Sequence, residues 1–300
     1  MSAATVDLGE TTTPRDPRAR GKAPRRRLGL WVVRDYAVLA VAVLVVVVPL
    51  IYMILSSFKT PSDLATSHLK IFPEVWRTAN YSDAVHQVPF GRLFLNSAIV
   101  TAVGAGVKVV LAILTAYGFV FCEFPGKKYL FWGVLVTLMV PPQVTALPNY
   151  VLISSLGGED TYWGIILPGL GTGFGTFLLR QAFLQLPYEV IEAAELDGAG
   201  HWRRLWHCVV PMALPSIATV AMVNIVYEWN DYLWPLIITS DPNMMTLPRG
   251  LTLLINPDNQ AQTFGILMAG TVMVIVPVLL VFSALQRHIV NGFTQGGVKG

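Results

Sequence analysis

Charged residues are scarce in this chain of 300 residues: they make up 13% of it, against 54% hydrophobic residues, and the mean hydropathy is +0.56. Soluble domains carry about 25% charged residues, so the deficit indicates a bilayer environment rather than one water-soluble core. A helix needs about 20 apolar residues to cross a bilayer. Six stretches meet this requirement, five without any Asp, Glu, Lys or Arg and one interrupted only by Lys108: residues 36–55, 129–152, 161–179, 205–227, 261–286 and 93–122. The sequence therefore predicts an all-α, polytopic membrane protein with six transmembrane helices.

Cysteine is also scarce, and the phosphate-binding loop of nucleotide hydrolases is missing. Cys122 and Cys208 fall near span ends predicted to be cytoplasmic, where a reducing compartment excludes a disulfide, and they lack His neighbours at zinc-ligand spacing. The phosphate loop Gly-x4-Gly-Lys-Ser/Thr is not completed at either candidate, Gly21-Lys22-Ala23 or Gly126-Lys127-Lys128. We expect no metal site and no cofactor bound by this chain.

Basic residues are concentrated in alternate connections between the spans, which predicts the orientation because cytoplasmic loops are enriched in Lys and Arg. The richer set is Arg15, Arg18, Arg20, Lys22, Arg25, Arg26, Arg27, Arg34, Lys127, Lys128, Arg180, Arg203, Arg204, Arg287 and Lys299. The poorer set is Lys59, Lys70, Arg77, Arg92 and Arg249. Both termini are therefore expected in the cytoplasm.

Residues 1–27 form a basic segment poor in large apolar groups, which predicts a disordered cytoplasmic tail ahead of a membrane domain at 28–300. A nucleic-acid-binding arm is disfavoured because no aromatic residues are interleaved with the basic ones, so no nucleic acid is expected as a partner. The following apolar run is too long for a cleavable signal peptide.

A polar insert, residues 184–208, separates the fourth and fifth spans. Pro187 suits the first position of a helix, residues 188–197 favour helix, and Gly198 and Gly200 suit its end. A second short helix is expected at 201–208. Small side chains at 193, 194 and 199 are surrounded by charge, which fits a surface that another protein approaches closely. A solvated connector whose alanines only favour helicity fits the pattern equally well.

The insert resembles the EAA loop of permease subunits in ABC importers, written E-A-A-x3-G-x9-I-x-L-P. Here Glu192-Ala193-Ala194 is followed by Gly198 and then by Cys208-x-Val210-Pro211, with Cys and Val in place of Ile and Leu. An ordered set of further stretches is similar to the second, maltose-permease-like permease of carbohydrate importers in the binding-protein-dependent transport family. These are Ser56-Ser57-Phe58-Lys59, Asn80-Tyr81, Phe90-Gly91-Arg92, Asn96-Ser97, Ala116-Tyr117-Gly118, Phe124-Pro125-Gly126-Lys127, Leu179-Arg180-Gln181, Trp229-Asn230-Asp231 and Gly296-Gly297-Val298-Lys299-Gly300. The resemblance covers roughly residues 30 to 300.

The resemblance implies a permease domain of the type I ABC importer kind at 28–300, in the bacterial cytoplasmic (inner) membrane. It implies a second permease as partner, a heterodimer being favoured, two cytoplasmic ATPase subunits that carry ATP and Mg, and an external solute-binding protein. The chain itself is then no enzyme. The residues implied in coupling to the ATPase are Glu192, Ala193, Ala194, Asp197 and Gly198. The solute implied is an oligosaccharide or disaccharide, with a polyol phosphate such as glycerol 3-phosphate as the alternative.

Polar residues inside the spans are candidates for the substrate pathway, because planar polar groups and aromatic faces bind sugars. They are Gln143, Asn149, Asn224, Glu228, Trp229, Asn230 and Asp231. Asn224, Glu228 and Asp231 recur at helical spacing on one face, although a structural cluster near the external surface explains them equally well. Lys108 either lines the pathway or pairs with an acid of the partner permease, or it lies at a buried structural interface, which we favour.

Two other classes of function are less consistent with the sequence. A membrane enzyme needs convergent catalytic groups, but the His residues are scattered through loops and span ends. An ion-driven secondary transporter commonly has internal repeats and midplane charges, and only Lys108 fits. ATP dependence and binding-protein dependence of transport discriminate these alternatives.

Overall fold

The structure is a computed structural model that describes residues 30–65, 68, 70–171 and 173–296. The predicted tail 1–27 and the last four residues of the Gly-Gly-Val-Lys-Gly ending lie outside the described residues. Within the described ranges every regular element is a helix. The elements are α1 (Leu30–Ser56), α2 (Pro61–Leu64), α3 (Ala79–Gln87), α4 (Phe90–Phe121), α5 (Lys127–Thr137), α6 (Pro142–Ser155), α7 (Tyr162–Ile166), η1 (Leu167–Leu170), α8 (Gly173–Phe183), α9 (Tyr188–Leu196), α10 (His201–Arg204), η2 (Leu205–Val209), α11 (Val210–Met212), α12 (Leu214–Asn230), α13 (Leu233–Ile238), α14 (Leu247–Gly250), η3 (Leu251–Leu254), η4 (Pro257–Asn259) and α15 (Gln260–Gly296).

The six predicted spans correspond to three single helices and three bent pairs. Among the described residues, Val32–Ser56, Phe90–Phe121 and Pro257–Ala284 are each long and apolar enough to cross a membrane. The bent pairs are Lys127–Thr137 with Pro142–Ser155, Tyr162–Leu170 with Gly173–Phe183, and His201–Met212 with Leu214–Ile238. Counting each pair as one span gives six, so the prediction of a six-span all-α protein is confirmed by length and composition.

The bends follow from proline, which lacks a backbone N–H and clashes with the preceding helical turn. The third span turns by 96° just before Pro142, and the fifth turns by 82° beside Pro215. The fourth bends by 48° after the 3-10 turn that contains Pro168. The third and fifth spans are therefore each two helices separated by a sharp break.

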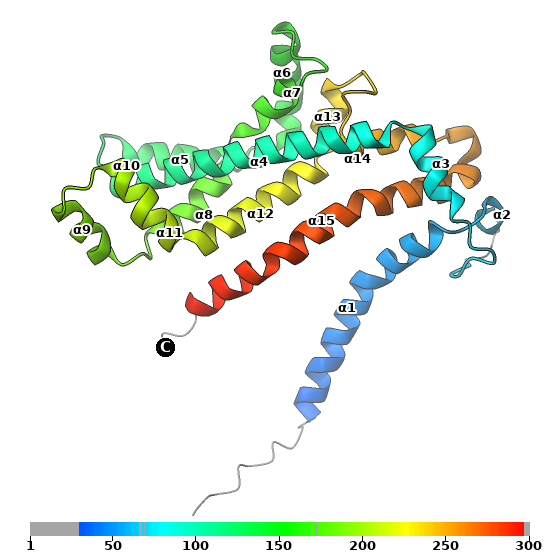
Figure 1. Ribbon diagram of the computed structural model, residues 1–300, viewed down its shortest axis with the longest axis horizontal. Helices are drawn as coiled ribbons and strands as arrows, with labels where there is room; N and C mark the ends of the chain where they lie inside the picture. Colours follow the sequence, from blue (N-terminus) through cyan, green and yellow to red (C-terminus); the bar gives the residue numbers. More distant parts are fainter. Residues whose placement is uncertain (1–29, 66–67, 69, 172, 297–300) are drawn as a thin grey trace, which may run out of the picture. The chain divides into compact units, whose positions relative to one another are not determined.

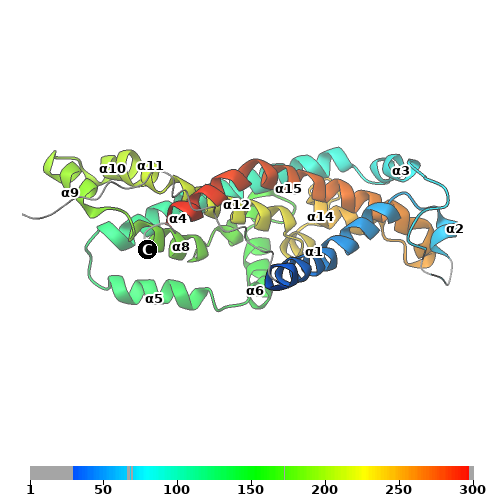
Figure 2. The same cartoon turned by 90° about the horizontal axis from the view of Figure 1, so that it is seen from below.

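Two units are distinguished in the chain, residues up to Leu50 and residues from Ile51 onward. The described part of the first unit is an apolar helical segment with mostly exposed side chains. In the second unit, α4 packs against α8 and α12, and α12 also packs against α15 (Figure 1). Figure 2 shows the same helices from below, with α5 next to α8. This packed group joins the polar insert to the spans.

Two buried asparagines fasten the connections at the end of the helices away from the polar insert. Asn80 Nδ2 donates to the carbonyl oxygens of Ser57 (2.8 Å) and Lys59 (2.9 Å). Asn96 Nδ2 donates to the carbonyl oxygens of Asn243 (2.8 Å) and Met245 (2.9 Å). Because a buried amide satisfies backbone groups that water cannot reach, Asn80 fixes α3 to the segment that follows α1, and Asn96 fixes the loop after α13 to α4. The quoted stretches Ser56-Ser57-Phe58-Lys59 and Asn80-Tyr81 are thus in direct contact.

The turn between α6 and α7 is also held by side chains. Hydrogen bonds from the hydroxyls of Ser154 (2.5 Å) and Tyr150 (3.0 Å) lower the pKa of Glu159, because they stabilise its charged form. Asp160 Oδ1 accepts from the backbone N–H groups of Ser240 (2.7 Å) and Asp241 (2.9 Å). The turn is therefore joined to the loop that follows α13.

Candidate functional site

The first helix of the polar insert, α9, ends at glycine as expected. The N–H of Gly198 bonds to the carbonyl of Glu195, and the N–H of Ala199 bonds to that of Ala194, both at 2.9 Å. These two bonds form a Schellman motif, which requires a left-handed residue after the C-cap. Gly198 is that residue, with φ of +76°. Its predicted role in the bend agrees with this geometry.

Two details of the insert differ from the prediction. Pro187 is the N-cap of α9 rather than its first helical residue, and Gly200 is the N-cap of α10 rather than part of the end of α9. The second helix leads into the fifth span, which was predicted to begin at residue 205: α10 continues through one turn of π-helix, η2, into α11. The insert is therefore an extension of the fifth span that carries a separate short helix.

An apolar underside fixes α9 to the spans. Ile191 is 2% exposed and belongs to a buried cluster that includes Leu205 and Val209 of η2, Phe183 of α8 and Ala116 of α4. The half-buried Cys122 and Cys208, both free thiols, pack around the same cluster. Since packed interiors transmit displacement with little deformation, a movement of α9 is passed to three spans.

A polar chain reinforces the same attachment. Arg204 Nη1 lies 2.7 Å from Glu195 Oε2, and Arg204 Nη2 lies 3.3 Å from His201 Nδ1. The Tyr117 hydroxyl, near the end of α4, lies 3.1 Å from that same nitrogen. The Tyr117 hydroxyl and the Arg204 guanidinium, which only donates hydrogen bonds, therefore meet at one ring nitrogen of His201. These polar contacts were not predicted from the sequence, although Tyr117 belongs to the quoted stretch Ala116-Tyr117-Gly118.

The outer face of α9 is open. Glu192, Ala193 and Asp197 are exposed as predicted, whereas Ala194 is half-buried by the Schellman turn. Leu196, at the tip, is 84% exposed. An isolated exposed leucine needs no explanation, but Tyr188 and Trp202 on the same insert are also more than half exposed. The surface available to a partner is thus apolar in part, which the emphasis on Ala and charge did not predict.

Inside the spans, Lys108 of α4 forms an ion pair with Glu228 of α12. The two side chains are only 8% and 10% exposed. Gly104, one turn before Lys108, leaves room for the Glu228 carboxylate, because a Cβ placed there would lie 3.0 Å from Oε2. The acid that pairs with Lys108 in the structure is Glu228 of this same chain. The pair lies at a buried interface between α4 and α12, which is the kind of location favoured for Lys108 from the sequence.

Trp229 is a packing residue in this structure. It is 7% exposed, its indole Nε1 donates to the carbonyl oxygen of Val274 on α15 at 3.1 Å, and its ring meets Phe94 edge-on. In this structure Trp229 therefore joins α12 to α15, and its role in a substrate pathway remains a prediction.

The other candidates for the substrate pathway are spread over two helices. Asn224 and Asn230 donate to carbonyls one turn earlier in α12, at 3.0 Å and 2.7 Å, and Asp231 is the half-buried C-cap of that helix. Gln143 is exposed and Asn149 half-buried, both on α6. Among the described residues, no hydrogen bond joins the two groups, and their role in a pathway remains a prediction.

The arrangement defines a class of protein before any relative is considered. It has six apolar crossings, a buried ion pair between two of them, and a polar helical insert rigidly joined to three spans. The class is that of a multi-span membrane protein with a helical insert between two of its spans.

Comparison with known proteins agrees with this class. Residues 108–295 match the family described as "Binding-protein-dependent transport system inner membrane component". The chain is 33% identical over 267 residues to the sn-glycerol-3-phosphate transport system permease protein UgpE of Agrobacterium fabrum, a match that covers 87% of this chain and 95% of the relative. The UgpE proteins of Brucella abortus and of Yersinia pestis are 31% and 32% identical with the same coverage. The chain belongs to this family of inner membrane transport components and is an ABC importer permease.

Solved structures show the same fold. A chain of a bacterial ABC transporter involved in the import of the acidic polysaccharide alginate superposes with a TM-score of 0.75 at 21% identity, covering 87% of this chain and 97% of that one. A chain of the alginate transporter in complex with an alginate-bound periplasmic protein superposes with a TM-score of 0.61 at 12% identity. The type I permease fold expected from the sequence is confirmed.

Proposed function

We propose that this chain is one of two permease subunits through which an ATP-driven importer moves a hydroxyl-rich solute inward. A separate ATPase subunit hydrolyses ATP and binds the polar insert, and an external binding protein delivers the solute. The observation that carries the proposal is the attachment of α9, whose outer face is open while Ile191 and Arg204 join it to α4, α8 and the fifth span. An exposed helix held this firmly is suited to transmit a displacement from a partner to the spans.

The proposed orientation places the insert and both termini on the cytoplasmic side of a bacterial inner membrane. Lys127, Lys128, Arg180 and Arg203 lie at the same end of the spans as the insert, which is the side that cytoplasmic enrichment in basic residues predicts. A heterodimer with a different permease remains the expected assembly. ATP and Mg belong to the ATPase subunits in this arrangement.

For the solute we propose the class of sugars and polyol phosphates, with glycerol 3-phosphate as the first compound to test. The support comes from relatives that are named as sn-glycerol-3-phosphate permeases and cover most of this chain. An oligosaccharide is the second candidate, favoured by the fold shared with the alginate transporter.

The test is uptake by proteoliposomes that contain the chain with its co-expressed partner permease and ATPase, supplied with the binding protein and ATP. We expect uptake of labelled glycerol 3-phosphate that requires both ATP and the binding protein. Uptake of labelled maltose or a longer oligosaccharide under those conditions, without glycerol 3-phosphate uptake, would favour the second solute class. Uptake independent of ATP would contradict the proposed mechanism.

A further inference from the structure

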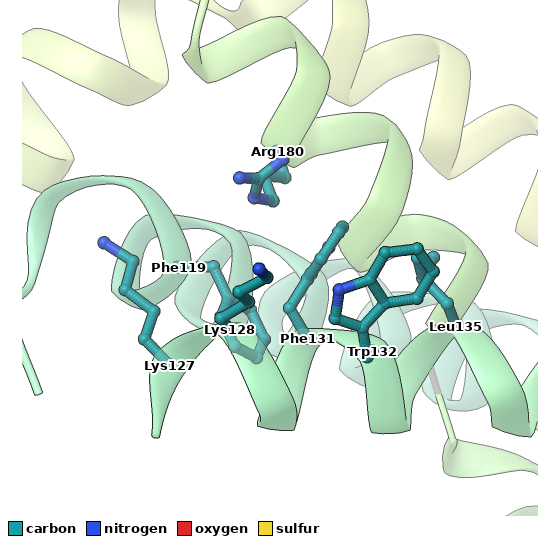
Figure 3. A pocket seen from close by; sticks show the side chains of 7 residues that line it. All are labelled: Phe119, Lys127, Lys128, Phe131, Trp132, Leu135 and Arg180. Carbon is teal, nitrogen blue, oxygen red and sulfur yellow. The ribbon is translucent and has the colours of Figure 1, made fainter. Parts of the chain in front are cut away.

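A groove that the transport function does not use lies between α5, α8 and the end of α4. It encloses about 500 Å³ and is lined by Phe119, Lys127, Lys128, Phe131, Trp132 and Arg180, with one leucine (Figure 3). Three cations and three aromatic rings thus meet in one place, and no acidic residue is among those that line it.

The three cations differ in how far their hydrogen-bonding capacity is used. Lys127 Nζ donates to the carbonyl oxygens of Val120 (3.2 Å) and Cys122 (2.9 Å), and so caps the C-terminal end of α4. Arg180 stacks over the Phe131 ring at 4.3 Å, but its Nε is buried and has no hydrogen-bond partner. Within the described residues, neither Arg180 nor Lys128 is in an ion pair.

Arg180 is partly buried and is in no ion pair among the described residues, so an anion beside it would offset the cost of removing its charge from water. A guanidinium matches phosphate geometry through parallel N–H donors, and the exposed Lys128, at the first turn of α5, can supply a second charge. Figure 3 shows Arg180 and Lys128 near the Phe131 ring, with Trp132 beyond that ring. The site therefore combines anion donors with an apolar wall.

The surface next to the groove is suited to acyl chains. α5 has no buried residue, and Leu130, Trp132 and Val136 are each more than half exposed. Aromatic and basic residues at the end of a span are typical of the membrane–water boundary. A ligand with a phosphate and hydrocarbon tails fits this combination, whereas a free phosphate leaves the apolar wall uncovered.

We propose that this groove binds the head-group phosphate of an anionic phospholipid of the cytoplasmic leaflet, held by Arg180 and Lys128 with its acyl chains along α5. The leaflet rests on the orientation in the proposed function; the binding site itself does not. Basic pockets between helices on that side recognise such head groups by the same chemistry.

The test is native mass spectrometry of the detergent-purified full chain with added phosphatidylglycerol or phosphatidylcholine. We expect the wild type to retain phosphatidylglycerol preferentially. Each basic residue near an anionic lipid contributes about 1 kcal/mol, so Lys128→Gln should weaken retention about fivefold, and Lys128→Gln with Arg180→Gln about thirtyfold. The matched control is Lys70→Gln with Arg77→Gln, which removes two charges that already have acidic partners, Glu74 and Asp83. It should retain the lipid as the wild type does.

Three outcomes would overturn the proposal. They are equal retention of the two lipids by the wild type, equal retention of phosphatidylglycerol by the wild type and Lys128→Gln, and displacement of the lipid by millimolar inorganic phosphate. The single variant changes an exposed side chain, so loss of folding does not obscure its result. Because no transport is measured, failure here leaves the proposed function untouched, and failure of uptake leaves this site untouched.

Discussion

At the scale of single residues, the backbone conformation of Gly198 bears most directly on the proposed function. Its φ of +76° is a conformation that costs an L-amino acid other than Asn or Asp about 1–2 kcal/mol. A Cβ at this position meets no atom within 4 Å, so a side chain there would not clash with the rest of this chain. Any further penalty in the assembled transporter therefore comes from a partner.

Because backbone strain within the chain and contact with a partner are separate effects, two substitutions of Gly198 should give different results. Gly198→Ala adds strain to the turn, whereas Gly198→Asn adopts the left-handed conformation more easily but carries a larger side chain. We expect Gly198→Asn to retain more of the thermal stability of the purified chain than Gly198→Ala, yet to lose more ATP-driven uptake. The measurements are the melting temperature in detergent and uptake by proteoliposomes. If the variant with the lower melting temperature also has the lower uptake, the loss of uptake comes from strain in the turn and not from contact with a partner.

The ion pair between Lys108 and Glu228 gives a second prediction at this scale. Removing one partner of a buried pair leaves an uncompensated charge and costs about 3–5 kcal/mol. We therefore expect Lys108→Met to destabilise the purified chain strongly, and Lys108→Met with Glu228→Gln to recover most of the loss. Thermal unfolding of the two variants measures this coupling. A double variant no more stable than the single one would mean that Lys108 acts through something other than Glu228.

At the scale of elements, the two faces of α9 have separable tasks. Ile191 is buried in the cluster that joins the insert to the spans, and Leu196 is exposed at the tip. The first side chain contributes to packing inside the chain, and the second is open to contact with a partner.

Alanine at each position should separate these tasks. Ile191→Ala should lower the stability of the chain by about 2–5 kcal/mol, as for other buried aliphatic side chains. Leu196→Ala should leave stability within about 0.5 kcal/mol of wild type but reduce the amount of ATPase that co-purifies. Thermal unfolding and quantitative co-purification are the two readouts. If Leu196→Ala leaves the ATPase yield unchanged, the tip of α9 is not part of the interface.

The elements could largely be predicted from the sequence, because apolar runs and glycine act locally. The six apolar stretches and the end of α9 at Gly198 follow from hydropathy and from backbone preference. The pairing of Lys108 with Glu228 could not be predicted, since it depends on which helices pack together. Pro142 and Pro215 mark where the third and fifth spans break, but the presence of a proline does not set angles as large as 96° and 82°. Trp229 shows the same limit: a tryptophan in a span suits a sugar site or a helix interface, and its bond to Val274 on another span could not be predicted from the sequence.

At the scale of the whole molecule, the proposed orientation places the insert on the cytoplasmic side of the membrane. Ser155, the last residue of α6, and Gln185, in the insert, are both exposed and lie on opposite sides in the proposed topology. In a chain with Cys122 and Cys208 replaced by alanine, Ser155→Cys should react with a membrane-impermeant maleimide added to intact spheroplasts. Gln185→Cys should react only after the membrane is opened. The reverse pattern would invert the proposed topology.

The central claim is that a separate ATPase binds the exposed face of α9. Site-specific photo-crosslinking tests it most directly, with a photoreactive residue in place of Leu196 in the assembled transporter. The account predicts a covalent adduct between this chain and the ATPase subunit. An adduct with the external binding protein instead, or none with the ATPase in a complex that still transports, would contradict it.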